Sequence, residues 1–75
     1  MSLQDELNRI AGTTNRTKKD CLNILAGKAD LSLDSTTAAN VWAGTTGLRL
    51  QDAINAEAGT TGLRKQDAAK LIPVV

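Results

Sequence analysis

Apolar residues recur along this chain in short groups that have the spacing of one helical face. In 50–58 they fall at Leu50, Ala53, Ile54 and Ala58, which is i, i+3, i+4 and i+8. In 3–11 the spacing is similar. Such a periodicity over eight or nine residues predicts a short amphipathic helix. The chain is therefore expected to be all-α.

These helices belong to a tandem repeat of about 15 residues. Ala-Gly pairs begin at positions 11, 26, 43 and 58, so the spacings are 15, 17 and 15. An Asn stands three residues before each pair, and Thr-Thr follows three of the pairs. A repeat in one register predicts tandem helix-turn units that are stable only when stacked on one another. The recurrent positions that we expect to be structural are Asn8, Asn23, Asn40, Asn55, Gly12, Gly27, Gly44 and Gly59.

Each glycine falls where a helix would end in a left-handed residue, and Thr-Thr-Gly then favours a turn. An Asp near each of several expected helix starts suits the positive end of the helix dipole. Asp67 opens a fifth, unfinished unit, so four helices and a partial fifth are expected. The repeated Asn has two interpretations: an amide that bonds backbone groups and fixes the repeat spacing, or a polar row that contacts a partner.

One break divides the repeat. The loop 28–34 is two residues longer than its counterparts and separates the halves 1–27 and 35–71 of a single domain, 1–71. Ser35 is the expected N-cap of the third helix. Pro73 cannot continue a helix, so 72–75 is expected to be an extended tail. The candidates for contact with a neighbouring protein are Trp42, Ile72, Pro73, Val74 and Val75.

Composition predicts a core that needs partners. The chain has 75 residues and neither Phe nor Tyr, and Ala fills many apolar positions. Small domains of this kind usually need disulfides, a metal or a partner. Since Cys21 is alone, a partner is the expected solution, and an oligomer or a lattice position follows. We place the centre of the core in the second and third units, at Cys21, Leu22, Leu25, Ala26, Ala39, Trp42 and Ala43.

The sequence lacks the usual side chains of catalysis and of cofactor or metal binding. There is no His and a single Cys, so we expect no enzyme, no zinc site and no cofactor. Asp30 and Asp34 alternate with other oxygen ligands, but the Gly and the distal acid of a calcium loop are missing. The Thr-Thr-Gly loops are expected to be turns rather than anion sites. Cys21 is expected to be a buried small hydrophobe rather than a reactive thiol.

Charge argues against nucleic acid and membranes as partners. The net charge is +1, and acids and bases are interspersed. Basic side chains without aromatic residues between them are typical of a solvated surface. No apolar run is long enough to span a bilayer, and no signal peptide is evident. A lone Cys fits synthesis in a reducing cytoplasm.

The segment QDAINAEAGTTGLR at 51–64 resembles a repeat found in virion structural proteins of tailed bacteriophages, often ones that infect actinobacteria. The similarity covers 3–71 and is clearest in 36–67. It implies a small virion structural protein, above all a capsid decoration or minor capsid protein. Its partners would be other virion proteins, first of all the capsid lattice, in many copies or as a homo-oligomer. Alternatives are a tail, connector or fibre-attachment component, a host-surface-binding module, and a small DNA-binding protein.

Overall fold

The computed structural model describes residues 2–74, which form helices and no strand. This confirms the expected all-α repeat with an incomplete fifth unit. The five helices of this region are α1 (Leu3–Ala11), α2 (Lys18–Ala26), α3 (Ser35–Ala43), α4 (Leu50–Ala58) and α5 (Lys65–Lys70).

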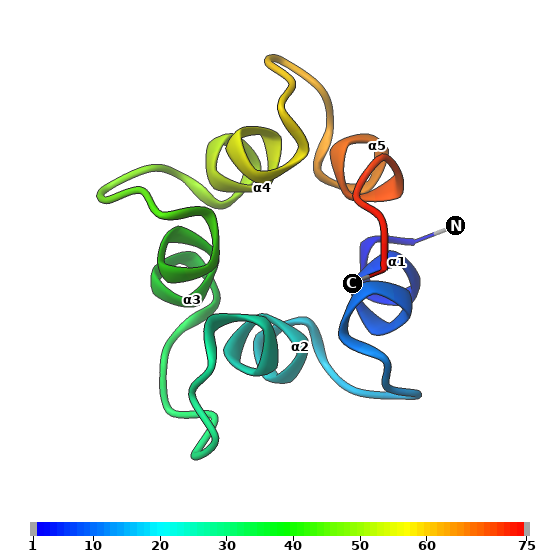
Figure 1. The fold of residues 1–75 in the computed structure, drawn as a ribbon, viewed down its shortest axis with the longest axis vertical. Coiled ribbons are helices and arrows are strands. Elements are labelled where there is room, and N and C mark those ends of the chain that lie inside the picture. Colours follow the sequence, from blue (N-terminus) through cyan, green and yellow to red (C-terminus); the bar gives the residue numbers. More distant parts are fainter. Residues whose placement is uncertain (1, 75) are drawn as a thin grey trace.

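The helices stand side by side around a closed ring, which Figure 1 shows nearly end on. Each helix packs against the next, and α5 packs against α1. The molecule measures 30 × 26 × 19 Å, with the helices lying roughly along its shortest dimension. Although the loop 28–34 is longer than the other connections, α2 packs directly against α3. The two expected halves are therefore adjacent parts of one ring.

Local signals at the helix ends explain where the helices begin and end. The first four helices each end at a left-handed Gly, with φ between 73° and 81°. Side chains of Ser2, Thr17 and Asp34 accept hydrogen bonds from the first turns of α1, α2 and α3. The prediction of Ser35 as N-cap is wrong by one residue, because the Asp34 carboxylate takes the N–H of Thr37. A carboxylate there also suits the helix dipole.

Successive helices run in the same direction because each connection returns along the helix that it leaves. The amide of Asn8, in α1, donates to the carbonyl of Gln4 in the same helix and to that of Arg16, each at 2.9 Å. Arg16 directly precedes the N-cap of α2. The start of α2 therefore lies beside the body of α1. The repeat places all helix starts near one face of the disc and all helix ends near the other.

The core is formed by two positions of every repeat. The first position is the residue directly before each Asn, or before Lys70 in the fifth unit, and the second is the residue before that one. Neither position has exposed surface, except that Glu6 at the second position is 5% exposed. The larger side chains at the first position, Leu7, Leu22 and Ile54, fill the centre beside Ala39 and Ala69. The second position holds Glu6, Cys21, Ala38, Ala53 and Ala68. Small residues there let neighbouring helices approach closely.

Two sequence expectations about the core are corrected. The core is shared around the ring rather than centred on the second and third units; Leu25, Ala26, Trp42 and Ala43 are only partly buried. Ile72 is 6% exposed and belongs to this core, so it does not lie on a neighbour. Its position repeats that of Ile10, Leu25 and Trp42. The inward apolar positions of the helices are thus buried against one another within the ring.

Candidate functional site

A buried asparagine joins each of the first four helices to the loop that follows it. In α4 the Asn55 amide donates to the carbonyls of Gln51 (2.8 Å) and Leu63 (2.9 Å). Its Oδ1 accepts the Thr60 hydroxyl at 2.8 Å and the Leu63 N–H at 3.1 Å. The side chain therefore uses both donors and both acceptor sites. We call this arrangement the asparagine clamp.

Three clamps have this full set of bonds, and one lacks a bond. Asn8 and Asn40 bind their own helix and loop as Asn55 does. Asn23 holds both backbone groups of Leu33 but accepts no hydroxyl, because Lys28 stands where the other loops have Thr. The four Asn side chains thus form their hydrogen bonds with groups of the chain itself, and Asn23 has no exposed surface. The first Thr of each Thr-Thr pair serves the clamp.

Restoring the missing hydroxyl should stabilise the protein. We expect Lys28→Thr to raise the free energy of unfolding by about 1 kcal/mol, because one more intramolecular hydrogen bond forms at Asn23. Lys28→Val, which has the same shape without the hydroxyl, is the matched control. Urea denaturation measures both. Equal midpoints for the two variants would show that the hydroxyl contributes nothing to the clamp.

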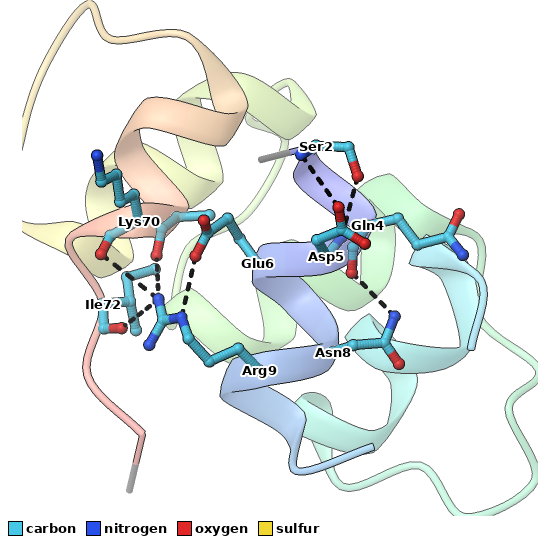
Figure 2. A network of polar contacts seen from close by, with 9 residues as sticks. Ser2, Gln4, Asp5, Glu6, Asn8, Arg9, Lys70 and Ile72 are labelled. Carbon is cyan, nitrogen blue, oxygen red and sulfur yellow. Dashed lines mark hydrogen bonds and ion pairs between the residues drawn. The ribbon is translucent and has the colours of Figure 1, made fainter. Parts of the chain in front are cut away.

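A network of polar contacts closes the ring where no loop joins the helices, as Figure 2 shows. The Glu6 carboxylate, which is buried, accepts the Arg9 Nε–H at 2.9 Å. The same guanidinium donates to the carbonyls of Ala69 (3.1 Å) and Ile72 (3.0 Å) and, more weakly, Lys70 (3.4 Å). Unlike the other helices, α5 ends without a left-handed glycine. Arg9 thus donates hydrogen bonds to carbonyls at the end of α5, where the other helices have a glycine cap and a following loop. We call this contact the seam.

Several basic residues near the helix starts have acidic partners. Arg49 pairs with Asp52 at 3.3 Å, and Arg64 pairs with Asp67 at 3.0 Å. Arg16 stands 4.0 Å from Asp20. The Lys19 ammonium donates to the carbonyl of Leu31. Exposed pairs of this kind contribute little stability, but they neutralise the positive charge locally.

Asp30 and Asp34 both serve the chain's own turns. Asp30 accepts from the N–H and hydroxyl of Ser32, and the hydroxyl bond lowers the pKa of this carboxyl. The pKa of Asp34 is also lowered, first by the hydroxyl of Thr37 and then by its N–H. Within residues 2–74, no three His, Cys, Asp or Glu side chains gather in a group that could hold a metal ion.

Cys21 lies inside the ring with no exposed surface, 3.7 Å from the Thr13 hydroxyl. Burial raises the pKa of the thiol above its ordinary value. A protonated, enclosed thiol is a weak nucleophile. Cys21 occupies the second core position of α2, where three other units have Ala.

The residues expected to contact a neighbouring protein differ in how exposed they are. Trp42 is half-buried against the core, Pro73 and Val74 are exposed, and Val75 lies outside the described residues. Sequence reasoning missed the outward position directly after each Asn, which holds Arg9, Ile24, Val41, Ala56 and, after Lys70, Leu71. Val41 is 51% exposed and Leu71 is 58% exposed. The signal was available, since this position varies between repeats while the clamp beside it recurs.

Shallow grooves lie between the outer helix faces and the loops. One is lined by Thr36, Thr37, Val41 and the loop 45–48, and counterparts lie beside α1 and α4. Among residues 2–74, every buried side-chain nitrogen and oxygen has a hydrogen-bond partner. The buried polar groups therefore hold the fold together and leave none directed at a ligand.

No helix in the described part of the chain has the length and apolar character needed to cross a bilayer. Comparison of the sequence with protein-family models and curated proteins, and of the structure with solved structures, gave no match.

Proposed function

We propose that this chain is a non-enzymatic structural protein of a tailed-phage virion, first of all a capsid decoration or minor capsid protein that binds other virion subunits. The observation that carries the proposal is the contrast, within each repeat, between the recurrent polar positions and the variable outward position. The recurrent polar residues form the clamps and turns within the chain. The outward position after Asn, in contrast, varies between repeats and is apolar in α2, α3 and α4.

Exposed apolar side chains on a rigid ring suit protein contacts better than chemistry on a small molecule. Ile24, Val41 and Leu71 face outward from three different units, and Val74 adds a fourth apolar side chain. The resemblance of 51–64 to phage virion repeats supports the virion as the setting. A carbohydrate-binding role has less support, because the single aromatic residue, Trp42, is half-buried.

The experiment is quantitative mass spectrometry of purified particles of the encoding phage. We expect the chain at a fixed ratio to the major capsid protein. Absence from washed particles would contradict the proposal, and a few copies per particle would favour the connector or tail alternatives.

A binding assay with particles that lack the chain tests the surface itself. Val41→Asp and Leu71→Asp should each reduce binding at least tenfold, because a charge would have to be desolvated in an apolar contact. Gln4→Asp adds the same charge at an exposed polar position and is the matched control. Equal binding by all three variants would exclude the outward position as the contact surface.

Nucleic acid is not expected to be a partner. Arg16, Arg49 and Arg64 each lie beside an Asp, which offsets part of the positive charge that phosphate contacts would need. Binding through several phosphates would fall steeply with salt. Filter binding at low salt should show only weak retention without sequence preference. Submicromolar binding near physiological salt would overturn this prediction.

A further inference from the structure

Two places in the ring differ from the other junctions between helices. The first is the seam, where α1 and α5 pack with no covalent connection between them. The second is the loop 28–34, which joins α2 to α3 and has no counterpart of equal length. Together they divide the ring into the pair α1–α2 and the trio α3–α5.

The seam is held by noncovalent contacts alone. Arg9 binds the carbonyls of Ala69 and Ile72, while Glu6 orients its guanidinium. At every other junction a loop limits how far two helices can separate, and an asparagine clamp fixes that loop. Opening the seam breaks noncovalent contacts only, so the same contacts can re-form with a different chain.

The loop 28–34 stores strain and is weakly clamped. Leu31 has φ of 56°, a left-handed conformation that is unfavourable for a residue with a side chain, because Cβ then crowds the following carbonyl oxygen. The α1–α2 loop also has one left-handed residue other than glycine, but this residue is Asn15, and Asn tolerates the conformation better than Leu. Leu31 is not among the side chains packed against the core. The clamp at Asn23 also lacks the hydroxyl bond that the other clamps have.

We propose that the loop 28–34 is a hinge through which two copies of this chain exchange halves. In the exchanged dimer, α1–α2 of one copy pack against α3–α5 of the other at both the seam and the α2–α3 junction. Both contacts already exist in the closed ring, so the dimer loses none of them. Extending the hinge releases the left-handed conformation of Leu31. The exchange goes beyond the proposed virion role and does not depend on it.

The test is native mass spectrometry of a mixture of ¹⁵N-labelled and unlabelled protein, made at high concentration and followed over time. We expect dimers of mixed isotopic composition that form slowly, because each exchange requires an open ring. Arg9→Ala should speed the mixing, whereas Arg64→Ala, which removes an exposed pair on a single unit, should not. A chain that stays monomeric at millimolar concentration overturns the proposal. Dimers that mix at once would be surface contacts and would overturn it too.

A hinge substitution separates exchange from ordinary association. Leu31→Asn relieves the left-handed strain of the closed loop and should raise the dimer dissociation constant about tenfold, with two hinges contributing per dimer. Ala29→Asn introduces the same side chain in the same loop at a residue without positive φ. An unchanged dissociation constant for Leu31→Asn, or an equal change for both variants, contradicts the hinge.

Discussion

Replacing Asn55 with Ala is expected to lower the melting temperature by at least about 10 °C. The substitution removes four hydrogen bonds at once and leaves the N–H and carbonyl of Leu63 without their partner. Each stranded buried group costs about 1–3 kcal/mol. In a domain of this size, each kcal/mol of lost stability lowers the melting temperature by roughly 4–8 °C. A total loss near 3 kcal/mol therefore lowers it by at least about 10 °C. Asn40→Ala should behave in the same way.

Two further variants calibrate this result by circular dichroism melting. Thr60→Ala removes only the hydroxyl bond to Asn55 and should cost about 1 kcal/mol. Thr61→Ala changes the exposed neighbouring Thr and should leave the midpoint nearly unchanged. If Asn40→Ala and Asn55→Ala melt like the parent but bind their assembly poorly, the asparagines form a contact row and the clamp is wrong.

Ending the chain at Leu71 is expected to destabilise the fold by about 3 kcal/mol. The truncation removes Ile72, whose burial contributes about 1.5–3 kcal/mol, and takes one carbonyl acceptor from Arg9. The helical signal should therefore melt at a lower temperature and with a less cooperative transition. This differs from the role that the sequence suggested for 72–75, namely binding to a neighbour without a place in the fold.

A chain that ends at Ile72 is the matched control for this truncation. It keeps the buried side chain and loses only 73–75, so it should melt within about 0.5 kcal/mol of the parent, as expected for changes at exposed positions. If both truncations melt alike, Ile72 does not belong to the core. If only incorporation into particles suffers, the original interpretation of the tail is restored.

Local features of the fold were predictable from the sequence because each depends on neighbouring residues. The Ala-Gly pairs located the helix ends, and their register gave the incomplete fifth unit. The N-cap of α3 was missed by one residue, since Asp34 and Ser35 are both good caps. The left-handed Leu31 was not foreseen, because leucine carries no signal for that conformation.

Ring closure could not be predicted from the repeat, because it depends on a small rotation that accumulates over five units. The sequence nevertheless held a clue to the seam. Glu6 stands where the other units have Cys or Ala, and Arg9 stands where the other units have Ile, Val, Ala or Leu. These two departures lie one turn apart and mark the place where the first unit meets the last. The abundance of Ala predicts a core that needs partners, and in the ring Ala also allows close contacts between neighbouring helices.

The contact between α1 and α5 should be measured in a dilute, monomeric sample by nuclear Overhauser spectroscopy. A closed ring predicts cross-peaks between the side chain of Arg9 and the protons of Ala69 and Ile72, whose carbonyls lie within 3.1 Å of the guanidinium. Intact helices and asparagine clamps without any cross-peak between α1 and α5 would show an open solenoid and contradict the ring.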